Sequence, residues 1–246
     1  MDLLGDVVSW FADGDNWSGR FGVPARLREH VWASVVSLVL ACGIALPIGL
    51  LLGHLRRGGA LAVNISNVGR ALPSLAVIVL AFQVWGRSWL PVYVALVVLA
   101  VPPILTNTYT GIAGVDDDVR ESARGMGLTG GQILRRIELP LGLPLIMAGI
   151  RTAAVTVVAT ATLAALIGLG GLGRFIVDGR AIGRRGDAEL LAGALLVGVL
   201  SILTEVGLGA VQRALVPKGL RSRNELPPSL AEGVAPVNVP QPEGST

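Results

Sequence analysis

The side chains that most often bind metals or act as nucleophiles are scarce in this sequence and stand apart from one another. The two histidines, His30 and His54, are 24 positions apart, and the one cysteine, Cys42, lies in an apolar run between them. Metal sites usually combine several such side chains at short spacing, and one cysteine permits no intramolecular disulfide. No spacing brings a nucleophile, a base and an orienting acid together. We therefore expect no metal centre and no enzymatic site.

A glycine pattern at residues 168–173 has the G-x-G-x-x-G spacing of a dinucleotide-binding loop, with Gly168, Gly170 and Gly173 at the key positions. That loop needs a strand before it and a helix after it. Here the preceding residues, 141–167, form a nearly uncharged run of helix length, so the glycines are expected to form a bend at a membrane surface. The chain also has no G-x-x-x-x-G-K-[ST] nucleotide-binding loop.

Composition indicates an integral membrane protein. Of the 246 residues, 52% are hydrophobic and 15% are charged, and the mean hydropathy is +0.66. A soluble domain seldom combines so much apolar surface with so few charges. The net charge of +3 does not indicate nucleic-acid binding, because the basic residues are dispersed among loop ends instead of forming a stripe.

The longest polar stretch between apolar regions runs from Asp118 to Pro140. Two short helices are expected here, with Asp118 as the N-cap of the first and Thr129 forming a capping box with Gln132 in the second. Gly125 and Gly127 are expected to break the chain between them. The second helix would carry an apolar face for packing against another structure, and its remaining residues would lie on its surface. The apolar face is Ile133, Leu134 and Ile137, and the surface residues are Gln132, Arg135, Arg136 and Glu138.

This segment resembles the EAA motif, E-A-A-x3-G-x9-I-x-L-P, of the membrane subunits of ABC importers. The spacing agrees throughout, and the one departure is Ser122, where the consensus has alanine. In that family the loop is the coupling helix, which seats in a groove of the cytoplasmic ATPase and transmits the motion of ATP binding and hydrolysis. The resemblance implies an ATPase-coupling role for Glu121, Ser122, Ala123, Gly127, Ile137, Leu139 and Pro140.

About five transmembrane helices are expected. Residues 31–53 have no charge over 23 positions, and a helix of that length spans the hydrocarbon layer of about 30 Å. The other predicted spans are 71–85, extended back to residue 63, 89–112, 141–167 and 190–211. Proline inside the second span predicts a kink there. The small residues of the fourth span predict a central place in a bundle or pore.

Charge distribution predicts the orientation. With five spans, one side of the membrane holds 12 of the 20 Lys and Arg residues, which favours a cytoplasmic central loop at residues 116–140. The domain order is then an extracytoplasmic segment, residues 1–30, a permease domain, residues 31–213, and a disordered cytoplasmic tail, residues 214–246. The N-terminus is outside, and residues 175–188 form an external loop able to meet a partner.

Polar and proline residues within the spans are candidates for lining a pore or for packing. Glu205 is expected to have a partner or to face the pore, because an unpaired carboxylate in lipid costs several kcal/mol or more. The full candidate set is Pro73, Ser74, Asn107, Tyr109, Arg151, Thr156, Thr160 and Glu205.

Four further segments, residues 71–76, 103–112, 147–153 and 161–173, look like the permease subunits of osmoprotectant importers, which carry glycine betaine, carnitine, choline or proline betaine. The resemblance covers roughly residues 30 to 213. It implies an all-α type I importer fold in the bacterial inner (plasma) membrane. It also implies two ABC ATPase subunits that bind ATP and Mg, a second permease subunit, identical or homologous, and an extracytoplasmic solute-binding protein, with no cofactor in this chain.

Two alternatives remain open: an importer of the same type for another small solute, such as an amino acid, and a stand-alone channel or ion-coupled carrier. The carrier is less favoured because Glu205 is the only ionisable residue at membrane depth. Trimethylammonium groups are usually held by an aromatic cage. The tryptophans of the spans lie at helix ends, which leaves only Phe82, Tyr93 and Tyr109 as aromatic residues in the interior of the spans. We therefore expect solute affinity to reside in the binding protein.

Overall fold

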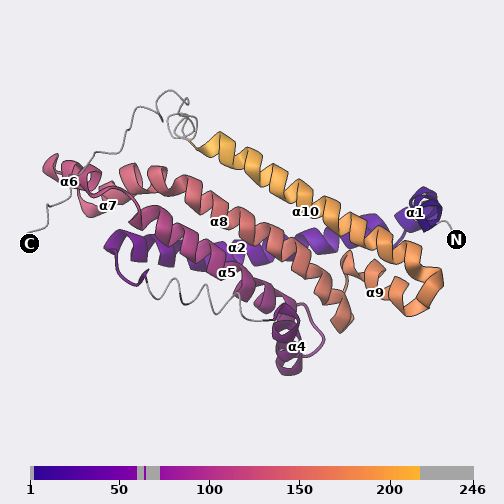
Figure 1. The fold of residues 1–246 in the computed structure, drawn as a ribbon. Helices are drawn as coiled ribbons and strands as arrows, with labels where there is room; N and C mark the ends of the chain where they lie inside the picture. Colours follow the sequence, from indigo (N-terminus) through magenta and orange to yellow (C-terminus); the bar gives the residue numbers. More distant parts are fainter. Residues whose placement is uncertain (1–2, 60–63, 65–72, 217–246) are drawn as a thin grey trace, which may run out of the picture.

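A computed structural model of the protein describes residues 3–59, 64 and 73–216, and every regular element in this part of the chain is a helix (Figure 1). Residues 217–246 of the predicted tail lie outside the described residues, as do residues 63 and 65–72 of the predicted second span. Among the described residues, four stretches are long and apolar enough to cross a membrane. They contain the helices α2 (Val23–Leu55), α5 (Leu90–Ala113), α8 (Leu139–Thr160) and α10 (Asp187–Leu215).

The long helices begin and end where the local sequence requires. Pro24 stands in the first turn of α2, where its missing N–H breaks no helical hydrogen bond, and Arg56 ends the helix in the left-handed conformation. Helix α2 therefore extends the predicted first span at both ends. Pro102 and Pro103 lie inside α5 without ending it, because neighbouring helices shield the freed backbone groups from lipid.

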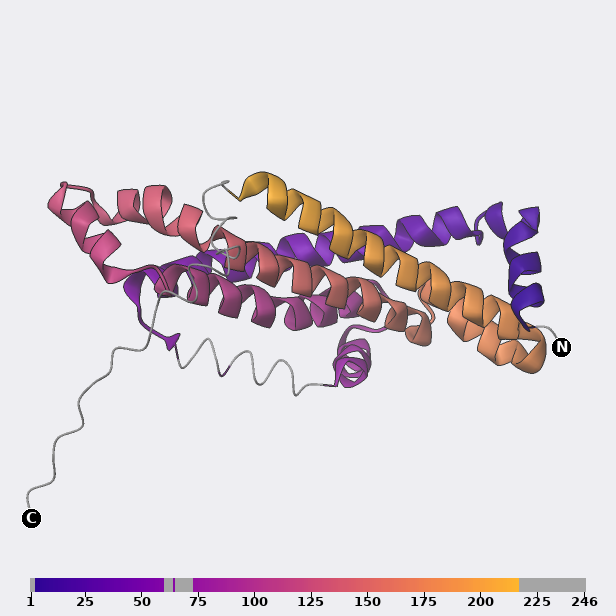
Figure 2. The same ribbon diagram turned by 45° about the horizontal axis from the view of Figure 1, so that its top comes forward.

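The second predicted span is described only from Pro73 onward, and the interruption expected at Pro73 is confirmed, because Pro73 has an extended backbone and the helix begins at Ser74. Its described part is α4 (Ser74–Trp85), a helix of 12 residues and about 18 Å, too short to cross the membrane. It lies crosswise to the bundle (Figures 1 and 2). The C-terminal ends of α2 and α5 both lie at the end of the bundle that holds residues 116–138 (Figure 1).

Helix α5 is the centre of the bundle, and the predicted central helix, α8, lies beside it. One face of α5 packs against α2 and another against α8, while α10 lies on the far side of α8 (Figure 1). Small residues allow this approach, as expected where helices have no hydrophobic attraction for each other in lipid. On α2 they recur every four residues: Ala41, Ala45, Gly49 and Gly53 are all buried.

Two glycines bring the backbones of α5 and α8 into direct contact. A Cβ atom at Gly142 would lie 2.8 Å from the Gly111 carbonyl oxygen, and a Cβ atom at Gly111 would lie 2.8 Å from the Gly142 carbonyl oxygen. Both neighbours are backbone atoms, which cannot rotate away. The separation of these two helices is therefore fixed at a point one turn from the start of α8.

The predicted external loop, residues 175–188, is in fact helical. Helix α8 continues as the 3₁₀ helix η3 (Ala161–Ile167), turns at the glycines, and is followed by α9 (Gly173–Ile182) and η4 (Gly183–Gly186). Helix α9 folds back against α10, with Phe175 buried next to Gly193. The loop was predicted from the charged residues of this segment. Phe175 and its apolar neighbours, however, give the segment a face that packs against α10.

The bundle has two unlike ends (Figures 1 and 2). One carries the short helices α6 (Asp117–Gly125) and α7 (Gly130–Ile133), and the other carries α9 together with the N-terminal elements α1 (Leu3–Ala12) and η1 (Gly14–Trp17). A functional site at one end is therefore separated from the other end by the length of the spanning helices.

We predict that Gly142→Ala destabilises the protein by about 1–3 kcal/mol, because the added methyl group forces two backbones apart. The measurement is thermal unfolding of the purified protein in detergent. Gly43→Ala is the matched control, since Gly43 lies on a helix with open space around it and alanine favours helix. Equal unfolding temperatures for the two variants would contradict the close packing of α5 and α8.

Candidate functional site

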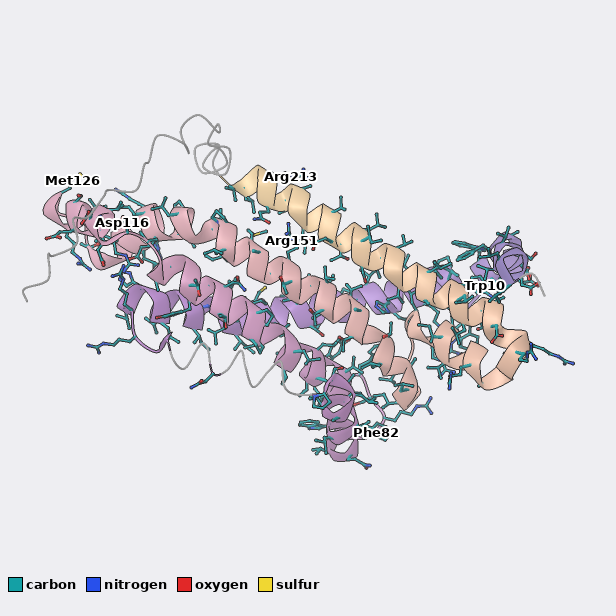
Figure 3. All side chains as sticks on the ribbon, viewed as in Figure 1. Trp10, Phe82, Asp116, Met126, Arg151 and Arg213 are labelled. Atoms are coloured by element: carbon teal, nitrogen blue, oxygen red, sulfur yellow. The ribbon has the colours of Figure 1, made fainter. Side chains whose placement is uncertain are left out.

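The polar segment predicted from the sequence lies at one end of the bundle, where Asp116 and Met126 are labelled in Figure 3. Residues 116–138 are called the tip below. The N-cap of α6 is Asp116, two residues earlier than predicted, and its Oδ1 accepts from the backbone N–H of Asp118 at 2.8 Å. Residues 116–118 are all aspartates, and each could cap the helix. In the structure the first of them, Asp116, is the N-cap. The predicted capping box of Thr129 and Gln132 is confirmed.

Gly127 ends α6 in a Schellman motif. The N–H of Leu128 donates to the carbonyl of Ala123, and the N–H of Gly127 donates to the carbonyl of Arg124. This arrangement requires a left-handed residue after the cap, and Gly127 has a φ of 81°. The predicted break between the two helices is confirmed. Glycine occupies this position because it adopts the left-handed conformation without strain.

The second helix of the segment is not a separate short element. Helix α7 continues through a π turn (Leu134–Glu138) directly into α8. Pro140 has no N–H to donate to the carbonyl of Arg136, and its ring would clash with that carbonyl in a regular helix. The wider π turn accommodates this, and single π turns are frequent at functional sites. The tip is thus joined to a spanning helix by continuous backbone.

A buried charge cluster holds the tip against the bundle, and sequence reasoning missed it. Glu138, predicted to lie on the helix surface, has a side chain only 1% exposed. Its Oε2 lies 2.7 Å from His54 Nδ1, and its Oε1 lies 3.1 Å from Arg120 Nε. The Arg120 side chain is 3% exposed. The carboxylate therefore joins the end of α2 to α6 at the start of α8.

Arg120 also reaches the end of α5. Its guanidinium donates to the carbonyl of Ile112, while its Nε contact with Glu138 lacks the alignment of a hydrogen bond. Burial lowers the pKa of Arg120, and the Glu138 carboxylate opposes that shift. Because the pKa of arginine starts far above neutral, the guanidinium stays charged. The cluster of Arg120, Glu138 and His54, called here the buried clamp, thus links α2, α5, α6 and α8.

A second, exposed ion pair lies beside the buried clamp. Arg56 donates to the carbonyl of Val115 at 2.8 Å and pairs with Asp117 at the start of α6. The hydrogen bond from Arg56 lowers the pKa of Asp117. This pair therefore stabilises the fold above the ordinary pKa of an aspartate and is lost as the pH falls through the lowered value. Because Asp117 is exposed, its contribution is small.

The motif residues divide into an outward set and an inward set. Glu121, Ser122 and Gly127 are exposed, and Ala123 is buried. Ile137, Leu139 and Pro140 are half-buried. Two exposed apolar side chains that the motif does not include, Val119 and Met126, add to the outward set. They lie seven residues apart, about two turns, so they share one face with Ser122.

The pore and packing candidates do not gather at one place. Pro73 caps α4 and Ser74 begins it. Asn107 donates to its own helix at Pro103, and Tyr109 packs near Gly59. Thr156, exposed on α8, donates to the carbonyl of Thr152. Thr160 is half-buried at the end of α8.

Arg151, labelled in Figure 3, forms a polar link with Glu205 between α8 and α10. Arg151 Nε lies 3.0 Å from Glu205 Oε1, and Arg151 also donates to the side-chain oxygen of Gln212. The Gln212 amide in turn donates to the carbonyl of Pro144. Glu205 therefore has the charged partner that its place in an apolar helix requires.

The glycine turn at residues 168–172 forms the predicted bend, and its polar groups are already engaged. The N–H of Gly171 donates to Glu29 Oε2 at 2.9 Å, and the N–H of Leu172 donates to His30 Nδ1 at 3.3 Å. Arg87 donates to the carbonyl of Gly168. The element before the turn is a helix, whereas a dinucleotide loop follows a strand.

The helical bundle, its apolar spans and the tip that continues into a spanning helix define a permease subunit of the ABC importer type. Solved structures of the MetNI methionine ABC transporter in inward-facing conformations show the same fold, with a TM-score of 0.66 and 24% identity over 77% of this chain and 94% of that one. Residues 45–218 match the model of the binding-protein-dependent transport system inner membrane component. The chain belongs to this family of bacterial inner-membrane proteins.

Curated relatives cover most of the chain. The glycine betaine/carnitine/choline transport system permease protein OpuCB of Bacillus subtilis is 38% identical over 82% of this chain and 92% of its own length. The choline transport system permease protein OpuBB of the same organism has the same identity and coverage. The carnitine transport permease protein OpuCB of Listeria monocytogenes is 38% identical over 80% of this chain and 89% of its own length.

Glu138→Ala is expected to destabilise the protein by about 3–5 kcal/mol, because Arg120 would remain buried without its counter-charge. Arg135→Ala, an exposed change in the same turn, should leave stability within about 0.5 kcal/mol. Chemical unfolding in detergent measures both. An equal loss for the two variants would mean that the buried clamp does not hold the tip.

Proposed function

We propose that this chain is the membrane-spanning permease subunit of an ATP-driven importer of quaternary-amine compatible solutes: glycine betaine, carnitine, choline or proline betaine. The observation that carries the substrate class is the 38% identity over most of the chain to relatives named for such solutes. Two further observations support the ATP-driven mechanism: the EAA motif, and the contacts of the buried clamp that join the tip to three spanning helices.

In the proposed mechanism the tip, residues 116–138, is the contact with the ATPase. Its outward face offers the Glu121 carboxylate and the Met126 side chain, which is 72% exposed. Methionine adapts to irregular apolar grooves. When the ATPase subunits approach each other, they displace the tip. Because the buried clamp ties the tip to α2, α5 and α8, the displacement passes to these spans instead of bending the loop.

The assembly that follows from this proposal has two ATPase subunits, which bind ATP and Mg, a second permease subunit and an extracytoplasmic binding protein. The tip then faces the cytoplasm, and the N-terminus and the α9 end face outward. The α9 end carries exposed arginines at positions 180, 184 and 185, so an acidic surface on the binding protein would complement it.

Solute selectivity is assigned to the binding protein. Trp89 and Tyr93 stack on each other with ring centroids 6.2 Å apart, which uses one ring face of each. Tyr109 lies 16 residues from Tyr93 on α5, about 24 Å along the helix, and Phe82 is on α4. These rings cannot enclose one trimethylammonium group within a single chain. The passage would instead be lined by small residues such as Thr152, Thr156 and Ala159, which share an exposed face of α8.

An importer of the same type for an amino acid is the second candidate, since a methionine transporter has the same fold. At 24% identity that likeness supports the fold alone. The ion-coupled carrier is the less favoured alternative. Such a carrier would need the Glu205 carboxylate to bind and release ions, whereas this carboxylate is paired with Arg151. Uptake of labelled solutes by cells that lack and then regain this gene, with and without ATP depletion, separates the three.

Glu121→Lys and Gly127→Val are predicted to lower solute uptake by about tenfold while the protein still inserts into the membrane. Valine at a φ of 81° is strained by about 1–2 kcal/mol, and tenfold corresponds to about 1.4 kcal/mol. Vesicles reconstituted with the permease and its ATPase, and supplied with the binding protein and labelled solute, give the measurement. Asp118→Asn, an exposed change outside the motif, is the control. Normal uptake by both motif variants would exclude the tip as the coupling element.

Purified permease and ATPase without the binding protein are expected to show no saturable binding of labelled glycine betaine at micromolar concentration. Equilibrium binding measures this, and addition of the binding protein should restore micromolar affinity. Saturable binding without it, abolished by Tyr93→Ala or Tyr109→Ala, would place the selectivity in this chain.

A further inference from the structure

The N-terminal helix α1 lies across the bundle instead of along it. In both ribbon views it stands crosswise to the long helices, at the end opposite the tip (Figures 1 and 2). It packs on α10 and on α9: Val7 is buried, and the Trp10 ring meets Phe175 of α9 edge-on with centroids 5.4 Å apart. A helix perpendicular to membrane-spanning helices runs parallel to the membrane surface.

The apolar arc of α1 is wider than the face that α10 covers. At 100° per residue, the apolar residues occupy about half of the helix circumference. Val7 and Trp10 use one side of this arc for packing. Leu4 and Val8, one turn apart on the other side, are 77% and 68% exposed. Two large apolar side chains on one face thus lack a partner in the described chain.

Two large apolar side chains after α1 are exposed as well. Trp17 and Phe21 are both exposed, and the Trp17 indole N–H donates to the carbonyl of Phe11. Tryptophan, with its apolar ring and polar N–H, is enriched at membrane–water interfaces. The polar residues Asp6 and Ser9 lie on the opposite face of α1 from Leu4, by helical geometry.

We propose that α1 lies in the interfacial layer of the membrane, with Leu4 and Val8 inserted among the lipids and Asp6 and Ser9 facing water. The lipid surface is the occupant that fits the orientation, because a crosswise helix at the end of a spanning bundle lies at the depth of the headgroups. Helix α10, on which α1 packs, also exposes large apolar side chains, with Leu195 and Val199 more than half exposed.

Charge indicates which lipids this contact uses. Residues 3–17 contain Asp6, Asp13 and Asp15 and no Lys or Arg, so α1 itself offers no positive charge to anionic headgroups. The arginines that follow, Arg20 and Arg26, lie over the Phe21 ring, outside α1. Apolar insertion therefore holds the helix, and zwitterionic lipid suffices. Through Val7 and Trp10, α1 then fixes the depth of α9 and of the start of α10 in the membrane. This inference rests on the membrane location of the family and not on the solute.

The test places a nitroxide label on single cysteines in the Cys42→Ser background, with the permease and its ATPase reconstituted in phosphatidylcholine vesicles. Leu4→Cys and Val8→Cys report the apolar face, and Ser9→Cys is the matched control on the polar face of the same helix. Spin relaxation by oxygen, which concentrates in lipid, is compared with relaxation by a water-soluble nickel chelate. The solute is not needed, so a wrong assignment of solute leaves the test intact.

We expect the ratio of oxygen to nickel relaxation to be several-fold higher at Leu4→Cys and Val8→Cys than at Ser9→Cys. Equal, water-like ratios at all three positions would overturn the proposal. Shielding of Leu4→Cys and Val8→Cys from both probes would also overturn it, because it would mean that a protein surface covers this face. Insertion seen only when phosphatidylglycerol is added would overturn the claim that apolar contact suffices.

Discussion

The buried carboxylate of Glu138 is the constraint on which the working end of this protein depends. Removing a charge from water costs several kcal/mol, and the cost is recovered only when partners surround it. Here the partners come from three different elements: His54 from α2, Arg120 from α6 and, through Arg120, the carbonyl of Ile112 at the end of α5. Any motion that separates these elements exposes or isolates a charge, so they move together.

The close packing of the spans complements this polar constraint. In lipid, helices gain little by hiding apolar side chains from one another, so their association depends on contact between backbones. Gly49 and Gly53 bring α2 against α5, and Gly111 and Gly142 bring α5 against α8. The three helices that the buried clamp joins at one end are therefore also the three that pack most closely along their length.

The opposite end is held by a different set of contacts. His30 accepts from the Leu172 N–H through Nδ1 and lies 2.8 Å from the Val158 carbonyl through Nε2, which fixes the neutral tautomer with its proton on Nε2. Together with Glu29 and Arg87 it holds the glycine turn against α2. Helix α10 is joined to α8 by Arg151 and Glu205, and α1 lies across its start. Among the described spans, α2, α5 and α8 thus form a closely packed core, and α10 is attached by the Arg151–Glu205 pair and by apolar packing against α9 and α1.

The sequence by itself determined the membrane class, the first, third, fourth and fifth spans, the glycine break and the identity of the tip, because these follow from local features: runs without charge, a capping box, a left-handed glycine and a spaced motif. The Asp116 cap, the helical form of residues 173–182 and the central place of α5 were decided by packing. So was the burial of Glu138, whose partner His54 is 84 residues away. A charged residue carries no local sign that the fold will supply its counter-charge. Only the tertiary structure, by bringing the ends of α2, α5 and α6 to the start of α8, turned a predicted surface residue into the centre of the site.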